Sequence, residues 1–413
     1  MKSRLMAAAL AAASLAIPAL AQTPPPAPAG IPNPGAWQLG GTPTIPLHFI
    51  GPILTGRPAS QLPLAELKVP HGFKVEVWAD GVANARSMAL GDKGTLFVGN
   101  LAGKNVYAIV DHGGKREVKT LLSGLDVPNG LVFSKGTLFL AERTRISRYD
   151  GIEDHLDNPP APKVMVVLPE NKPIHFWHYM TMGPDGDLYF NNGAPNNEVL
   201  PSYLQASILR LDPKTNILES YATGVRNSVG MTFRPGTHAL WFTNNARDWL
   251  SEDLPQDTLH VAVRKGENFG YPYCHQGDTL DPDFGKNRSC SEFAPPAAKL
   301  GAHVAPLAVR FYTGKMFPAE YRNTLFIARH GSWNRSKKQG YDVVRATIGP
   351  NNKVEKIEPF LTGFLTDASK DPPMWGRPVD ILQMPDGALL VSDDYNGIIY
   401  RVSYGSPRVA VGK

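Results

Sequence analysis

Cysteine is scarce in this chain, because only Cys274 and Cys290 occur among its 413 residues. Two thiols do not favour a cysteine metal site, and the lack of a Cys-x-x-Cys-His motif excludes covalently attached c-type haem. Any electrons that leave the protein must therefore pass to a separate carrier. If the chain is exported, a cysteine pair this close in sequence predicts one disulfide that closes a local loop.

Runs of one charge and long apolar segments are also scarce. The 42 Lys and Arg residues and 37 Asp and Glu residues leave a formal net charge of +5, without the basic cluster that nucleic-acid binding favours. One apolar stretch, residues 5–17, follows Lys2 and Arg4 and precedes Ala19-Leu20-Ala21, as in a secretory signal peptide. This stretch is too short for a membrane anchor. We therefore predict a signal peptide over residues 1–21, a periplasmic or secreted protein, and no integral membrane segment after its removal.

Composition divides the rest of the chain into three parts. Residues 22–65 are rich in Pro, Gly and Ala and lack periodicity, which predicts a leader outside the fold. Residues 66–405 carry one repeated pattern, which predicts a single domain, and residues 406–413 form a tail.

The repeated pattern is a turn, then Leu, an aromatic or apolar residue, and another apolar residue. It occurs at residues 96–98, 138–140, 188–190, 240–242, 325–327 and 389–391. Turn residues precede each copy, as in Gly183-Pro184-Asp185-Gly186. A sheet-forming unit repeated every few tens of residues is typical of a propeller. We therefore predict an all-β, six-bladed β-propeller with an insertion between residues 249 and 300.

Two sets of polar residues should meet on the face opposite these turns, because each blade places them at equivalent positions along its strands. The first set precedes the turns and comprises Arg86, Asn129, His175, Arg226, Asn227, Arg377 and His303. The second set follows the second strands and comprises Asn100, Glu142, Arg143, Asn191, Asn192, Asn244, Asn245, Arg329, His330, Asp393 and Asp394. Loops at strand ends are polar in any protein. The recurrence of cations, amides and histidine nevertheless favours an anionic, carbonyl-rich ligand near the axis.

Six segments resemble one known family when they are taken together and in order. They are 85–89 (ARSMA), 175–178 (HFWH), 224–227 (GVRN), 268–274 (NFGYPYC), 330–335 (HGSWNR) and 376–380 (GRPVD). These segments resemble the soluble quinoprotein sugar dehydrogenases, the glucose/sorbosone dehydrogenase family, and look most like the sorbosone dehydrogenase branch. The resemblance covers roughly residues 66–405. It implies a propeller that binds pyrroloquinoline quinone (PQQ) and Ca²⁺ and oxidises a sugar or related hydroxy-aldehyde, a small-molecule substrate.

The resemblance also implies residue roles. His175 matches the general base that takes the proton of the substrate hydroxyl, a role for which an ordinary histidine pKa near 6.5 is suited; His178 on the same segment is the alternative base. Arg226 matches a catalytic and cofactor-binding residue, because a guanidinium binds a carboxylate and stabilises charge developing on the quinone oxygen. The other cofactor-binding residues implied are Asn227, Arg377, Trp333 and Arg335.

Calcium is implied at the loop after the second strand of the fourth blade. Family members bind it there through backbone oxygens, which here fall near Asn245, Ala246 and Arg247, with Asp248 adjacent. Hard oxygen ligands suit Ca²⁺, whose charge would polarise the quinone carbonyl. The acidic residues at 252, 253 and 257 form either a second, structural calcium site or a solvated acidic loop.

The sequence also departs from the family pattern. Glucose-oxidising members have Asp, Gln and Arg where this chain has Ile174, Val229 and Val379. These changes weaken any assignment of glucose as the substrate, and no residue is assigned to orient His175. Two other functions remain open. A Ca²⁺-dependent lactone or phosphotriester hydrolase would use acidic and amide ligands such as Glu142, Asn191, Asn244 and Asp393. A non-catalytic binding propeller is the third possibility.

Overall fold

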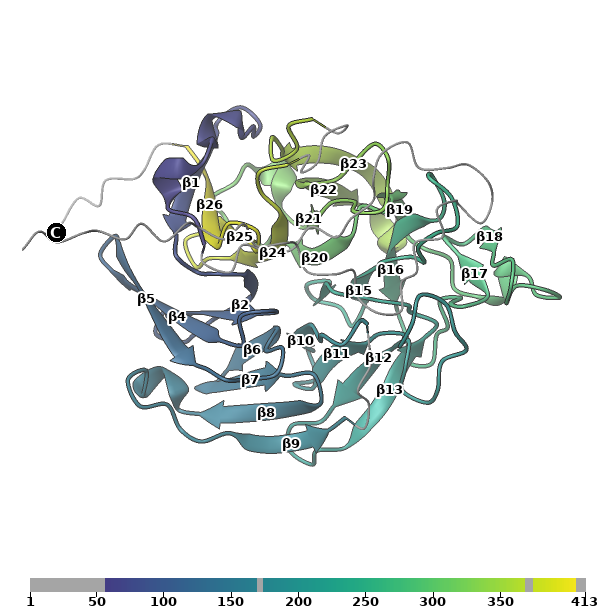
Figure 1. Ribbon diagram of the computed structural model, residues 1–413, viewed down its shortest axis with the longest axis horizontal. Helices are drawn as coiled ribbons and strands as arrows, with labels where there is room; N and C mark the ends of the chain where they lie inside the picture. The colour runs from purple at the N-terminus through teal and green to yellow at the C-terminus, as the bar shows by residue number, and fades with distance from the viewer. Residues whose placement is uncertain (1–55, 169–173, 368–373, 406–413) are drawn as a thin grey trace, which may run out of the picture.

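The computed structural model describes residues 56–168, 174–367 and 374–405. Six four-stranded antiparallel sheets stand around a central axis, and short 3-10 turns are the only helical elements in these residues (Figure 1). The prediction of an all-β, six-bladed propeller is therefore confirmed.

Five blades take their four strands in chain order, from the axis outward. Blade one has β2 (Ala85–Leu90), β3 (Leu96–Asn100), β4 (Val106–His112) and β5 (Lys115–Leu122). Blade two has β6 (Gly130–Ser134), β7 (Thr137–Ala141), β8 (Arg145–Asp150) and β9 (Lys163–Val167). Blade three has β10 (Met180–Met182), β11 (Leu188–Asn192), β12 (Ser207–Leu211) and β13 (Leu218–Thr223). Blade four has β14 (Met231–Phe233), β15 (Leu240–Asn244), β16 (Gln256–Ala262) and β19 (Ala298–Ala302). Blade five has β20 (Pro306–Phe311), β21 (Leu325–Arg329), β22 (Asp342–Ile348) and β23 (Val354–Leu361).

Blade six joins the two ends of the domain. Its inner strands are β24 (Pro378–Gln383), β25 (Leu389–Asp393) and β26 (Ile398–Tyr404), and its outer strand is β1 (Phe73–Ala79) from the start of the domain. Phe73 pairs with Tyr404 in an antiparallel register. This pairing closes the ring with backbone hydrogen bonds.

The repeated pattern is explained by side chains that alternate between the two faces of a strand. Leu96 and Val98 pack against blade six, in one cluster with Leu390. Phe97 points to the opposite face and packs with Leu138 of blade two. The same alternation recurs in the other blades, so each second strand buries apolar side chains on both of its faces. A strand buried on both faces needs a continuous apolar run rather than an apolar–polar alternation.

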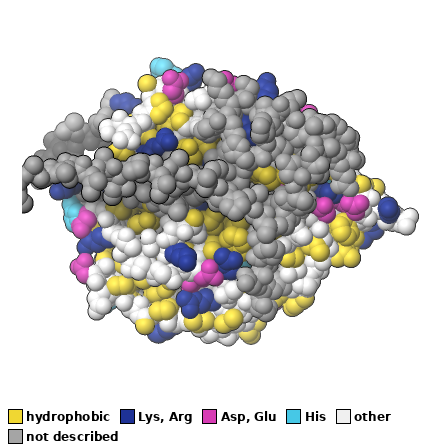
Figure 2. Space-filling view, viewed as in Figure 1, with side chains coloured by type: hydrophobic (Ala, Val, Ile, Leu, Met, Phe, Trp, Pro, Cys, Tyr) yellow, Lys and Arg dark blue, Asp and Glu magenta, His cyan; other side chains and the backbone are white. Residues whose placement is uncertain are grey.

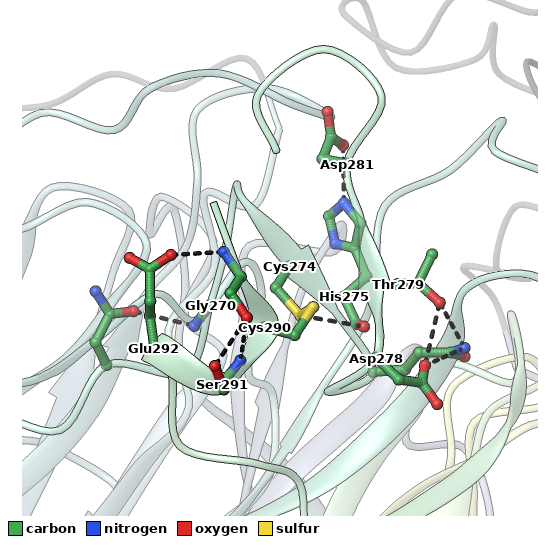
Figure 3. Close-up of a disulfide and its surroundings, with 12 residues drawn as sticks. Gly270, Cys274, His275, Asp278, Thr279, Asp281, Cys290, Ser291 and Glu292 are labelled. Carbon is green, nitrogen blue, oxygen red and sulfur yellow. Dashed lines mark hydrogen bonds and ion pairs between the residues drawn. A yellow bond between two sulfur atoms is a disulfide. The ribbon is translucent and has the colours of Figure 1, made fainter. Parts of the chain in front are cut away.

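The insertion lies between β16 and β19, inside the range predicted for it. It forms a hairpin of β17 (Cys274–His275) and β18 (Thr279–Leu280), and the Cys274–Cys290 disulfide confirms the predicted bond. His275 lies beside this disulfide, and its Nε2 is 2.8 Å from Asp281 Oδ2 (Figure 3). The disulfide and the contact between His275 and Asp281 therefore both stabilise the hairpin.

The N-terminal part of the described chain packs onto the propeller. Residues 56–65, placed in the predicted leader, contain two 3-10 turns, Ala59–Gln61 and Leu64–Glu66. Leu62 belongs to the apolar cluster between blades five and six. The predicted signal peptide, the leader as far as residue 55 and the tail lie outside the described residues, so these boundaries stay predictions. Within the described ranges, no helix has the length and apolar character needed to cross a membrane. On the described part of the face in Figure 2, basic, acidic and apolar side chains are intermixed.

Candidate active site

A cavity of about 550 Å³ lies where the starts of the first strands and the ends of the second strands meet. Every blade contributes to its lining, in order through Arg86, Arg143, His175, Arg226, His330 and Arg377. Polar residues from both predicted sets are therefore gathered in one place.

His175 is 4% exposed and lines this cavity. Its Nδ1 is 2.8 Å from the carbonyl oxygen of Ala194. A carbonyl only accepts, so Nδ1 carries the proton and Nε2 is the basic nitrogen of the neutral ring. A Cβ on Gly193 would lie 2.7 Å from the Cβ of His175, which makes glycine necessary for this close approach. His175 also has a φ of 51°, a left-handed backbone that non-glycine residues adopt mainly where surrounding structure enforces it.

His178 lies behind the cavity wall and is not one of its lining residues. Its Nδ1 is 2.6 Å from the carbonyl oxygen of Asn191, and its Nε2 is 3.1 Å from that of Arg143. Both ring nitrogens therefore face backbone acceptors and join the loops of blades two and three. This geometry favours His175 over His178 as the base.

One side of the cavity contains what we call the blade-four cluster: Asn197, Arg226, Asn245, Ala246 and Asp248. Nε of Arg226 donates to the Asn197 carbonyl at 2.8 Å. Its Nη1 donates to the carbonyls of Asn245 at 3.1 Å and Ala246 at 2.7 Å. Its Nη2 donates to Asn197 Oδ1 and Asp248 Oδ2, both at 2.8 Å. Since a guanidinium has five N–H groups, all the donors of this buried side chain are engaged within the protein.

Surrounding contacts hold this cluster in place. Asp248 Oδ1 accepts a hydrogen bond from Asn334 Nδ2 at 2.6 Å. The guanidinium of Arg247 turns away from the cavity and forms ion pairs with Asp281 at 2.6 Å and Glu198 at 3.0 Å. The disulfide-linked hairpin is thereby tied to the loop that follows β15.

Asp257 stabilises the loop after β15 through hydrogen bonds of its carboxyl group. Its two carboxyl oxygens accept the N–H groups of Ala246 at 2.8 Å and Ala305 at 2.7 Å. Burial raises the pKa of Asp257 to about 7, although these two hydrogen bonds oppose the shift. The other two acidic residues of the region face the loop after β21, because Glu252 accepts the N–H of Ser336 and Asp253 pairs with Arg335. Among the described residues, no three His, Cys, Asp or Glu side chains are grouped to hold a metal.

The other side of the cavity contains the blade-six cluster: Arg86, His330, Arg377 and Asp394. Asp394 pairs with Arg86 at 2.8 Å and accepts from His330 Nε2 at 2.9 Å. His330 Nδ1 lies 2.8 Å from Nη2 of Arg377. Because an arginine N–H only donates, His330 Nδ1 accepts and the ring is the neutral Nε2–H tautomer. The cluster therefore brings two guanidiniums, one carboxylate and a neutral imidazole together in a buried position.

Burial, reinforced by the charge of Arg377, lowers the pKa of His330 to about 4. Burial alone would raise the pKa of Asp394, but the hydrogen bond from His330 and the charges of Arg377 and Arg86 hold it below its usual value. Both groups therefore keep these charge states at neutral pH.

The remaining predicted residues fall in two places. Asn227 and Trp333 line the cavity. Arg335 does not: its Nη1 is 2.7 Å from Asp253, on the loop after β15, and its Nε donates to the Lys337 carbonyl. Its cofactor role stays a prediction.

Val229 and Val379, two of the departures from the family pattern, form an apolar cluster with Leu307, and Trp177 packs against it. Leu307 and Trp177 also line the cavity, so this part of the site is apolar. The residues that a hydrolase would need are engaged elsewhere: Glu142 accepts the N–H of Asp126, and none of the four lines the cavity.

No functional role is predicted from the sequence for His330, Asp394 or Asn197. His330 and Asp394 were among the residues following the second strands, and a His and an Asp in adjacent blades could have suggested a pair. Asn197 lies in a loop without a repeat position, so no pattern identifies it.

Sequence relatives share most of this chain. A family model described as TrAA12-like matches residues 277–405. An uncharacterized protein of Borreliella burgdorferi is 34% identical over 352 residues, spanning 82% of this chain and 91% of that protein. A pyrroloquinoline quinone-dependent sugar dehydrogenase of Hypocrea jecorina is 22% identical over 390 residues, 80% of this chain and 87% of that protein.

Solved structures share the fold. A Trichoderma reesei enzyme of Carbohydrate-Active Enzymes family AA12 has a TM-score of 0.72 at 20% identity, covering 87% of this chain and all (100%) of that one. The PQQ domain of a pyranose dehydrogenase from Coprinopsis cinerea has a TM-score of 0.67 at 19% identity, covering 82% and 97%. The fold is a six-bladed propeller with a cavity to which every blade contributes. By sequence, the chain belongs to the same family as the B. burgdorferi protein.

Proposed function

We propose that this protein is a PQQ-dependent oxidoreductase that oxidises a sugar or a related hydroxy-aldehyde. The observation that carries the proposal is one cavity lined by His175, whose Nδ1 carries the proton, and by the buried guanidiniums of Arg86 and Arg377 from other blades. The name of the H. jecorina relative and the PQQ domain of the C. cinerea neighbour support the cofactor. The family motifs support the sorbosone dehydrogenase branch.

The residues present fit an anionic, polar cofactor. The blade-six cluster would bind carboxylates of PQQ, which has three, because burying them without cations is costly. Several polar atoms of cavity-lining residues are buried and have no hydrogen-bond partner in the described part of the chain: Asn84 Nδ2, Trp177 Nε1, Asn227 Oδ1, Asn245 Oδ1 and Asn334 Oδ1. Such groups destabilise a protein unless something else satisfies them, and a bound polar molecule would do so.

When bound, PQQ would supply a two-electron acceptor for the hydride of the substrate C–H. The protein's own residues accept the proton of the substrate. Nε2 of His175 is the nitrogen that takes the proton of the substrate hydroxyl, and the Ala194 carbonyl holds the ring in the required tautomer and accepts from Nδ1–H of the imidazolium that forms. A backbone carbonyl thus takes the orienting role for which no side chain was predicted.

Calcium is part of the proposal. The carbonyl oxygens of Asn245 and Ala246 and the carboxylate of Asp248 are hard ligands that suit Ca²⁺, and all three now accept from Arg226. Bound there, Ca²⁺ would polarise a carbonyl of the cofactor. Export is also proposed, because a structural disulfide persists in oxidising compartments.

The test is to mix purified cofactor-free protein with PQQ and Ca²⁺ and to record the absorbance spectrum of the cofactor before and after sugars and aldehydes are added. We expect a shifted spectrum that a substrate then bleaches. No shift at micromolar PQQ would reject the cofactor. A shift that no sugar, alcohol or aldehyde bleaches would reject the dehydrogenase activity.

Replacing the base should separate binding from turnover. His175→Ala should keep the PQQ shift and lower the rate of bleaching by about 10³-fold, the range for loss of a general base. His178→Gln is the control, because His178 does not line the cavity, and its turnover should stay within a few-fold. A fully active His175→Ala variant would contradict the assignment of the base.

A further inference from the structure

Two consecutive carbonyl oxygens in the blade-four cluster converge on one atom. The oxygens of Asn245 and Ala246 lie 3.1 and 2.7 Å from Nη1 of Arg226, and Asp248 Oδ2 lies 2.8 Å from the neighbouring Nη2. Oxygens that converge in this way form a cation site, and here the cation is a side chain of the protein itself.

A divalent metal on the same oxygens would meet this guanidinium at close range. Calcium lies about 2.3–2.6 Å from its oxygen ligands. Both carbonyl oxygens already contact Arg226, whose charge would repel a second cation within a few ångströms. The two cations therefore compete for one set of oxygens.

The oxygens are held in place by contacts that do not depend on the guanidinium. Asp257 binds the N–H of Ala246, Arg247 ties the loop to Asp281, and Asn334 holds the second oxygen of Asp248. None of these contacts involves Arg226. The loop can thus keep its shape when the flexible arginine side chain leaves.

We propose that Arg226 is a resident cation that occupies the metal site until a divalent ion displaces it, and that the displaced guanidinium then turns its N–H groups to the cofactor. This inference rests on the calcium of the proposed function. It explains how an arginine with five engaged donors could still bind a ligand: the metal takes over the oxygens that now hold it.

The test is calorimetric titration of Ca²⁺ into metal-free protein without PQQ. Arg226→Gln removes the competing charge, so we expect this variant to bind Ca²⁺ at least tenfold more tightly than the unmodified protein. The control is Arg86→Gln, which removes a buried cavity arginine that does not touch these carbonyls, and its Ca²⁺ affinity should stay within about threefold. Equal or weaker Ca²⁺ binding by Arg226→Gln, or no binding to either protein, overturns the proposal.

A second variant guards against a misfolded Arg226→Gln. Arg226→Lys keeps the charge on a compact ammonium with three donors in place of five, and we expect an affinity between those of the unmodified protein and Arg226→Gln. An affinity as high as that of Arg226→Gln overturns the proposal, because the competing charge is still present. Because no PQQ is present, the result is independent of the cofactor: a PQQ shift without competition for Ca²⁺ rejects this inference alone, and competition without a PQQ shift rejects the proposed function alone.

Discussion

The blade-four and blade-six clusters place the same kind of side chain at equivalent positions of two blades, with opposite consequences. Arg226 is surrounded by oxygen acceptors that engage all of its donors and pair its charge with Asp248. Arg377 instead donates to the neutral His330, and its guanidinium lies in one cluster with that of Arg86. One side of the cavity therefore suits a cation and the other suits an anion.

The position of a residue in the repeated blade thus determines where its side chain lies, whereas the surrounding residues determine what that side chain can bind. The acceptors around Arg226 come from the loop between β11 and β12 of blade three, through Asn197, and from the loop after β15. The neutral partner of Arg377 comes from the adjacent blade. A ligand with both a carboxylate and a metal-binding oxygen would be oriented by this asymmetry.

The largest effect should come from breaking the support of the blade-four cluster. Arg247→Met leaves the buried Asp281 and the partly exposed Glu198 without their guanidinium and should destabilise the protein by about 4 kcal/mol in urea unfolding. Arg401→Met is the matched control, because its partner Asp386 is 51% exposed and such surface pairs contribute less than about 1 kcal/mol. Equal losses would mean that the insertion does not brace the cluster.

The next largest effect should be a loss of folding stability at acid pH that arises in the blade-six cluster. The pKa of His330 is lowered to about 4 in the fold, against about 6.5 in an unfolded chain. Folding therefore favours the neutral form of His330. The free energy of folding that this preference contributes, about 3 kcal/mol, is fully present above about pH 6.5 and is lost as the pH falls to about 4.

His330→Gln keeps an acceptor for Arg377 and a donor for Asp394 but cannot titrate. Between pH 7 and pH 4 its melting temperature should therefore fall less than that of the unmodified protein. The exposed His71, replaced in the same way, provides the control. Identical acid sensitivity of the His330→Gln variant and the unmodified protein would remove His330 from the explanation.

A smaller effect should distinguish the two arginines as ligand-binding groups. With EDTA present, Arg377→Gln should weaken PQQ binding about 30-fold, or about 2 kcal/mol, because a charged hydrogen bond is lost. Arg226→Gln should change the affinity less under these conditions, because its donors are engaged by the protein. Fluorescence titration with PQQ measures both, and a larger loss in Arg226→Gln would reverse the assignment of the two sides.

The fold was predictable because its signal is periodic. Residues such as Leu96, Phe97 and Val98 must be apolar on both faces of a strand packed between two blades, and that requirement recurs six times. The site was predictable only in position. His175 and Arg377 reach the cavity as expected, yet the orienting group of His175 is a backbone carbonyl, which leaves no mark on the sequence.

The hydrogen-bonding state of Arg226 was not predictable for a related reason. It depends on Asn197 and on the path of the loop after β15, both set by tertiary packing rather than by a local pattern. Arg335 shows the same limit, because two neighbouring residues of one loop, Trp333 and Arg335, turn to different surroundings.

The pairing of β1 with β26 has a consequence for when, during synthesis of the chain, the protein becomes able to bind its ligand. Arg86 follows the first strand of the domain by a few residues, whereas Asp394 precedes the last strand. The anion-binding charge is thus divided between the earliest and latest parts of the chain. A growing or truncated polypeptide would lack this pair however well its middle blades had formed, so ligand binding should report a completed ring.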